Sequence, residues 1–248
     1  MSESERTRTE APGGRAAPPA REPGARGRRF DAAVRGYLER CPRATVVALG
    51  EGLDTGFWRL DNGRLTWLTV VVPEAAAVRR MLLPDGPRRR TVACPAGGHD
   101  WLDAVHEPRH GVVVTAPGVL MRLSPAAVRA LLAACAERFP GGALVFDALP
   151  RLTAALARRA AAAPGGGRRP VPVRWGLDRV DLPRLAGTHP GIAAVREVGP
   201  VPPPGAAAWG LPSWLGQRAP VLRALTPLVC EVRFAGARSP RRASSAVR

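Results

Sequence analysis

The stretch Thr45 to Thr55, TVVAL followed by GEGLDT, decides the fold. Residues 45–49 form a short apolar run typical of a buried strand, and Gly50 and Gly52 follow it directly. Glycine permits a tight turn and lets a ligand approach the backbone closely. In an open α/β sheet, ligands bind beyond the carboxyl ends of the strands. We therefore predict that residues 50–55 form the leading candidate site.

Further apolar runs on both sides of this stretch alternate with helical patterns. The alternation predicts a doubly wound parallel sheet with right-handed crossovers. A helix over residues 30–38 precedes the first strand, and a pattern over 214–225 suggests a late helix. The predicted strands are residues 45–49, 65–72, 90–94, 111–115, 143–147, a weaker 192–195, and 228–234.

The composition sets the limits of a single domain. Residues 1–27 are rich in Arg, Pro, Gly and Ala without periodicity and predict a disordered tail. Residues 28–234 form one predicted domain, interrupted by a flexible connector at 164–172. Residues 235–248 predict a second, basic, disordered tail.

The charge is strongly positive, at +17 over 248 residues, yet it does not indicate nucleic-acid binding. Every basic residue is Arg, which a GC-rich coding sequence explains without selection for phosphate binding. The arginines are also dispersed, and aromatic residues do not interleave with a basic stripe as they do in many nucleic-acid-binding proteins. We expect no nucleic-acid partner.

Other classes are also disfavoured by the sequence. No apolar run reaches the roughly 18–20 residues that a membrane span needs, and the first residues lack a signal-peptide core. The four cysteines lie far apart without metal-ligand spacing, so we expect neither a disulfide framework nor a metal site. These features predict a cytoplasmic protein with no membrane partner.

The glycine-rich loop limits the kind of ligand. It has neither the GxGxxG spacing of a dinucleotide fold nor the GK[ST] ending of a nucleotide-binding loop. Asp54 places an acid where a phosphate-binding loop would avoid one. A cationic or zwitterionic ligand fits better, and a purely structural turn is the alternative.

A longer comparison sharpens this interpretation. TVVALGEGLDTGFWRLD (45–61) resembles the first motif of leucine carboxyl methyltransferase-like enzymes, in particular their bacterial branch of tetracenomycin-type polyketide O-methyltransferases. The resemblance covers about residues 26–234. Further matching stretches follow in the family's order: VVVPEAAAVRRMLLP, HDWLDAV, TAPGVLMRLSPAAVRALL and FPGGALVFDALP. It implies a class I S-adenosylmethionine-dependent fold with a seven-stranded sheet, mostly parallel with an antiparallel last strand, and helices on both faces.

The resemblance also implies which residues bind the cofactor, S-adenosylmethionine. Arg26 matches a family arginine that holds the methionine carboxylate, a task that suits bidentate pairing, and Arg28 or Arg29 could substitute for it. The implied cofactor-binding residues are Arg26, Gly50, Gly52, Asp54, Glu74 and Gly118.

Three positions depart from the family pattern. Val71 stands where an Asp usually binds the ribose hydroxyls, Gly98 where an acid contacts adenine, and Pro117 where Glu or Gln lies near the methionine amine. Loss of three hydrogen bonds of roughly 1–1.5 kcal/mol each would weaken binding by about two to three orders of magnitude. Glu74 or Asp100 could compensate from adjacent positions.

The sequence therefore favours an S-adenosylmethionine-dependent O-methyltransferase acting by direct displacement. Its acceptor would be a carboxylate or phenolic hydroxyl of a small molecule, with a polyketide-type metabolite as one candidate. The alternative is a degenerate, non-catalytic protein that keeps the fold for binding. Neither a catalytic residue nor an oligomeric state is predicted. Three histidines are candidate bases or ordinary loop residues, and three tryptophans are candidate pocket or core residues: His99, His106, His110, Trp175, Trp209 and Trp214.

Overall fold

A seven-stranded sheet forms the centre of the protein, in the order β3-β2-β1-β4-β5-β7-β6. The computed structural model describes residues 23–162, 172–202 and 225–236. Neighbouring strands pair in parallel from β3 through β2, β1 and β4 to β5, whereas β7 is antiparallel to both of its neighbours. This confirms the predicted fold class. The strands are β1 (Thr45–Leu49), β2 (Thr66–Val71), β3 (Arg89–Ala93), β4 (Val112–Ala116), β5 (Ala143–Ala148), β6 (Ile192–Glu197) and β7 (Leu228–Phe234).

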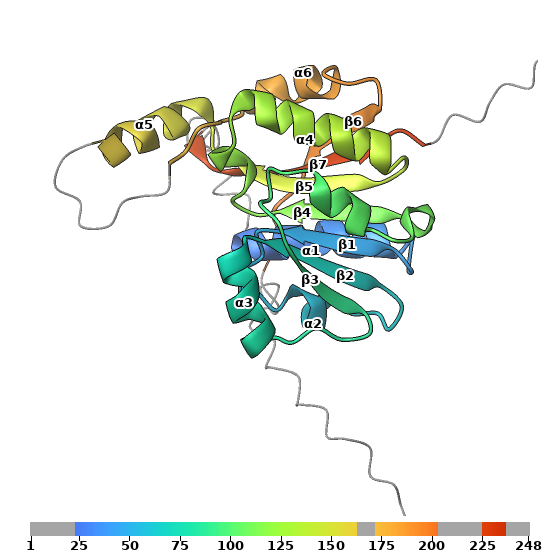
Figure 1. The fold of residues 1–248 in the computed structure, drawn as a ribbon. Coiled ribbons are helices and arrows are strands. Elements are labelled where there is room, and N and C mark those ends of the chain that lie inside the picture. The colour runs from blue at the N-terminus through green and yellow to red at the C-terminus, as the bar shows by residue number, and fades with distance from the viewer. Residues whose placement is uncertain (1–22, 163–171, 203–224, 237–248) are drawn as a thin grey trace, which may run out of the picture.

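Helices cover both faces of the sheet (Figure 1). Helices α1 and α2 pack on one face, while α4 and α6 pack on the other together with the 3-10 turn η1. Helix α5 projects away from the sheet (Figure 1). The helices are α1 (Ala25–Leu38), α2 (Gly56–Leu60), α3 (Pro73–Leu82), α4 (Pro125–Arg138), α5 (Arg151–Ala162) and α6 (Leu182–Ala186), with 3-10 turns η1 (Asp100–Ala104), η2 (Pro108–His110), η3 (Leu120–Arg122) and η4 (Arg179–Asp181).

The central strands are buried on both faces, which explains their nearly continuous apolar sequence. All residues of β1, β4 and β5 are buried. Phe30 and Val34 of α1 pack in the cluster on one face, and Leu131 and Leu132 of α4 pack in the cluster on the other. The apolar runs therefore predicted the strands, because a strand that is buried on both faces has apolar side chains at nearly every position.

Helix α1 begins earlier than the predicted start at residue 30. It starts at Ala25, inside the segment predicted as tail, and the Arg28 amide already donates to the Gly24 carbonyl at 3.0 Å. The hydrophobic spacing begins only at Phe30 because the arginines of the first turns bond to neighbouring loops and strands rather than to the core. Periodicity therefore missed the part of the helix closest to the site.

The position of β1 determines where a ligand can bind. Since β1 lies between β2 and β4, the crossovers on its two sides run in opposite directions. Their divergence opens a crevice at the carboxyl end of β1. The loop after β1 turns there through Gly50, whose φ of 67° disfavours any side chain and whose amide donates to the Val70 carbonyl at 2.8 Å.

Several predictions concern residues that the structure does not describe. Residues 1–22 of the first predicted tail, 164–171 of the predicted connector and 237–248 of the second predicted tail lie outside the described residues. So do Trp209, Trp214 and nearly all of the predicted helix at 214–225. Within the described ranges, no helix has the length and apolar character needed to cross a membrane.

Candidate functional site

The first loop is held in place by Arg79, a buried residue of α3. Its guanidinium pairs with the Glu51 carboxylate at 3.0 Å and donates to the carbonyls of Gly52 and Asp54, the latter at 3.2 Å. Bonds to three loop residues fix the backbone between β1 and α2. Helix α3 therefore positions the loop, although it follows a different strand.

The carboxylate of Glu51 is the centre of a buried polar network. Its Oε2 accepts hydrogen bonds from Trp67 Nε1 at 3.0 Å and Thr69 Oγ1 at 2.6 Å, both on β2, and pairs with Arg79. Burial raises the pKa of Glu51, while Arg79 and the hydrogen bonds from Thr69 and Trp67 act to lower that pKa. The network joins β1, β2 and α3 at the mouth of the crevice.

Asp54 lies at the exposed end of the same loop. Its Oδ1 pairs with Arg59 at 2.7 Å and accepts the Thr55 amide at 2.6 Å. Arg59 also forms a two-pronged pair with Asp31 of α1, at 3.0 and 3.3 Å. Despite the burial of its side chain, these two carboxylates raise the pKa of Arg59. Asp54 is thus held in place by Arg59 of α2, and its Oδ1 faces that arginine. The sequence did not predict this contact.

Arg26 and Gly118, two of the predicted cofactor residues, meet through Asp147. The Asp147 carboxylate is 2% exposed; it pairs with Arg26 at 3.2 Å and accepts the Gly118 amide at 2.5 Å. The end of β5 thereby joins α1 to the loop after β4. Arg26 remains 54% exposed, which leaves donors for a ligand.

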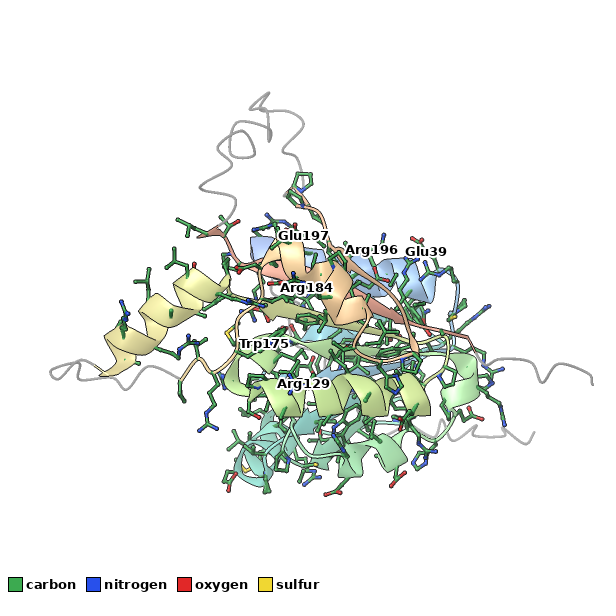
Figure 2. All side chains as sticks on the ribbon, turned by 90° about the horizontal axis from the view of Figure 1, so that it is seen from above. Glu39, Arg129, Trp175, Arg184, Arg196 and Glu197 are labelled. Carbon is green, nitrogen blue, oxygen red and sulfur yellow. The ribbon has the colours of Figure 1, made fainter. Side chains whose placement is uncertain are left out.

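The neighbouring arginines are engaged elsewhere. Arg28 donates to the carbonyls of Pro23 and Val201, and Arg29 pairs with Glu197 at 3.2 Å. Figure 2 shows Glu197 beside α1. Of the three arginines considered for the methionine carboxylate, Arg26 is therefore the one that faces the carboxyl edge of β1.

A cavity of about 200 Å³ lies between α1, the first loop and the carboxyl edge of the sheet, and we call it the β1 cavity. It is smaller than the roughly 300–1,000 Å³ of most small-molecule sites, so it suits part of a nucleoside-sized ligand. Its lining combines the cations Arg26 and Arg59 with three carboxylates. The lining residues are Arg26, Gly27, Phe30, Asp31, Val34, Ala48, Gly50, Glu51, Asp54, Gly56, Arg59, Leu60, Trp67, Thr115 and Pro117.

Glycines keep this cavity open. A Cβ on Gly50 would lie 2.8 Å from a Val119 methyl group, and one on Gly56 would lie 2.9 Å from the Trp67 ring. Both positions therefore exclude any larger residue. Arg26 lies exposed at one end of the cavity and can pair with a carboxylate of a ligand. The carboxylates in the lining favour positive charge on the same ligand.

The structure brings some predicted residues together and leaves others outside. The β1 cavity is lined by Arg26, Gly50 and Asp54. Gly52 lies between Gly50 and Asp54 in the first loop. Glu74 is exposed in the first turn of α3 and is not among the lining residues. Gly118 lies beside the cavity, next to Pro117.

The histidines do not gather at the site. His106 contacts Arg90 near the start of β3, and His110 pairs with Glu107 just before β4, so both lie at the amino-terminal edge of the sheet. His99 is exposed before η1. Trp175 packs on Phe146 with ring centroids 5.7 Å apart, which gives it a role in packing. Among the described residues no group of three or more potential metal ligands is found.

A second cavity, of about 300 Å³, adjoins the first at Arg26, and we call it the β7 cavity. Its wall is mostly apolar, with Asp147 among its polar members. The lining residues are Ala25, Arg26, Arg29, Asp147, Pro200, Val201, Pro227, Leu228 and Val229. Two neighbouring cavities that share one arginine provide space for two ligands.

The sequence missed three residues of the site: Glu51, Arg79 and Asp147. Asp147 is an acid at the end of an otherwise apolar strand, and this contrast was a usable signal. Arg79 was harder to find, because α3 carries arginines at both 79 and 80, and of the two only Arg79 is buried.

Comparisons with known proteins give one sequence relative and a set of similar folds. No protein-family model matches the sequence. Over 125 residues, the chain is 32% identical to the tetracenomycin polyketide synthesis O-methyltransferase TcmP of Streptomyces glaucescens. The match covers 50% of this chain and 46% of that relative, so the chain spans less than half of its length.

Solved structures show the same architecture. A DUF574 family protein from Streptomyces avermitilis matches with a TM-score of 0.56 at 16% identity, over 84% of this chain and 82% of the other. The methyltransferase domain of bacterial CtHen1-C matches with a TM-score of 0.51 at 15% identity, over 85% and 99%. This is the methyltransferase fold. In this fold the β1 cavity occupies the crevice at the switch point between β1 and β4.

Proposed function

We propose that the protein is an S-adenosylmethionine-dependent O-methyltransferase of the leucine carboxyl methyltransferase-like family. Its acceptor would be a carboxylate or phenolic hydroxyl of a small molecule, with a polyketide-type metabolite as a candidate. The observation that carries the proposal is the β1 cavity, where an exposed arginine and three carboxylates surround a glycine-lined space at the switch point. The likeness to a polyketide O-methyltransferase supports the reaction type.

The residues of the cavity fit the proposed cofactor. Arg26 would bind the methionine carboxylate, with Asp147 holding the guanidinium in place. Gly50 and Gly52 would let the ligand approach the loop backbone, while Asp54 would provide negative charge near its cationic groups. When bound, S-adenosylmethionine supplies an activated methyl group. The protein's part is then to position the acceptor oxygen and exclude water, which requires no covalent nucleophile.

The proposed partners follow from the same surfaces. The apolar β7 cavity would hold the small-molecule acceptor, because it adjoins the β1 cavity at Arg26. We propose no nucleic-acid or membrane partner and a cytoplasmic location, as the dispersed charge and the absence of long apolar runs in the sequence predict.

A non-catalytic binding protein with this fold is the second candidate. The observation that favours it is the apolar end of β2, where Val71 is buried and offers no hydrogen bond to a ligand. Pro117 in the cavity wall likewise has no amide hydrogen to donate.

A titration of S-adenosylmethionine into three proteins tests the proposal. Asp54→Ala removes a charged group from the cavity, so we expect about a tenfold to hundredfold loss of affinity. Val71→Asp adds an acid at the end of β2 and should strengthen binding. If the wild type shows no binding at millimolar ligand and Val71→Asp does not restore it, the non-catalytic protein becomes the better account.

A further inference from the structure

One oxygen of the buried Glu51 carboxylate is available to a ligand. Oε2 takes the bonds from Trp67, Thr69 and Arg79, and these hold a side chain that is only 5% exposed. Among the described residues, none donates a hydrogen bond to Oε1. This oxygen lies 3.0 Å from where a Cβ on Gly56 would be, and both residues line the β1 cavity. The carboxylate is therefore fixed by one oxygen and presents the other.

The place of this carboxylate relative to β2 suggests its role. In doubly wound folds, an acid about 20 residues beyond the glycine turn commonly accepts hydrogen bonds from ribose hydroxyls. Here the end of β2 is apolar, with Val70 and Val71. Thr69, which donates to Glu51, is two residues before Val71, so the two side chains point to the same face. Glu51 thus brings a carboxylate to the face of β2 on which that acid is missing.

The other carboxylates of the cavity are less suitable. Asp31 is engaged by both prongs of Arg59, and Asp54 lies at the exposed end of the loop. Glu74, considered from the sequence as a substitute, is exposed outside the cavity lining. Glu51 alone among them combines burial, rigid fixation and a free acceptor oxygen over β2.

We infer that Glu51 is the residue that binds the ribose of the adenosyl group, with Oε1 accepting a hydrogen bond from a ribose hydroxyl. This inference rests on the proposed function and deepens it, because it assigns the recognition of a vicinal diol to the loop after β1. The acid that is absent from β2 is supplied by the glycine-rich loop itself. The departure at Val71 then no longer argues against nucleoside binding.

Calorimetric titrations with S-adenosylhomocysteine and its 2′,3′-dideoxy analogue test this assignment. We expect Glu51→Gln to weaken binding of S-adenosylhomocysteine about tenfold to a hundredfold. The dideoxy analogue should bind the wild type and Glu51→Gln with similar affinity, since it lacks the group that Oε1 would contact. Glu74→Gln, the matched control, should leave the preference for the hydroxylated ligand unchanged.

Comparing two ligands within each variant separates recognition from a general loosening of the loop. Equal losses for both ligands in Glu51→Gln, or a loss of discrimination in Glu74→Gln instead, would overturn the inference while leaving the proposed function intact. If neither ligand binds the wild type, the proposed function fails and this inference fails with it. Should Glu51→Gln not fold, Glu51→Asp keeps the negative charge but shortens the reach, and it should show the same reduced discrimination.

Discussion

Arg79 is the residue on which the shape of the first loop depends most. It is buried, pairs with Glu51 and holds the carbonyls of Gly52 and Asp54. Arg79→Met would leave the Glu51 carboxylate buried without its cation. Breaking such a pair costs about 3–5 kcal/mol of unfolding free energy. Urea denaturation should show this loss.

Two further variants separate loss of the pair from a general helix effect. Arg129, labelled on α4 in Figure 2, is exposed, so Arg129→Met should change stability by less than about 0.5 kcal/mol. Adding Glu51→Gln to Arg79→Met removes the stranded charge and should recover part of the loss. A loss below about 1 kcal/mol in Arg79→Met alone would contradict the assigned role.

Glu51 should also give the protein a characteristic dependence on pH. Burial raises the pKa of Glu51 above the ordinary value of 4.5, although Arg79 opposes this. Between the ordinary value in the unfolded chain and the raised value in the folded protein, the folded state binds more protons. Stability from this group therefore falls as pH rises through that window.

Glu51→Gln removes this titration. Unfolding free energies measured at successive pH values above about 4.5 should show the wild type losing stability relative to the variant as pH rises. Parallel pH profiles for the two proteins would show that Glu51 has an ordinary pKa and that its burial has no electrostatic consequence.

At the scale of elements, the beginning of α4 depends on one side chain. Ser124 Oγ accepts the Ala127 amide at 3.2 Å, and Pro125 occupies the first helical position. Ser124→Ala should destabilise the protein by about 0.5–2 kcal/mol, whereas Ser124→Gly should cost only a few tenths. Thermal unfolding that ranks the two variants in the reverse order would contradict the capping role.

Elements were more predictable than the contacts between them. The strands β1, β4 and β5 could be located because burial on both faces requires a continuous run of apolar residues in the sequence. The ion pairs that build the site produce no comparable sequence pattern. Arg26 with Asp147, and Glu51 with Arg79, join residues distant in the chain that meet only after the sheet has formed.

At the scale of the whole molecule, topology concentrates the candidate chemistry at one edge. The first loop, Asp147 and Gly118 all lie at the carboxyl ends of parallel strands, and α1 covers them from one face. This edge could be foreseen from the alternation of strands and helices. The compensation of Val71 by Glu51 could not, because it depends on a hydrogen bond between a loop and the neighbouring strand.

Hydrogen exchange with and without S-adenosylhomocysteine tests the central claim, that the β1 cavity binds the methyl donor, most directly. The ligand should slow exchange of the backbone amides at residues 50–56 and at Gly118, and leave the amides of η2 unchanged, because η2 lies at the opposite edge of the sheet. Protection confined to other segments, or no protection at millimolar ligand, would contradict the account.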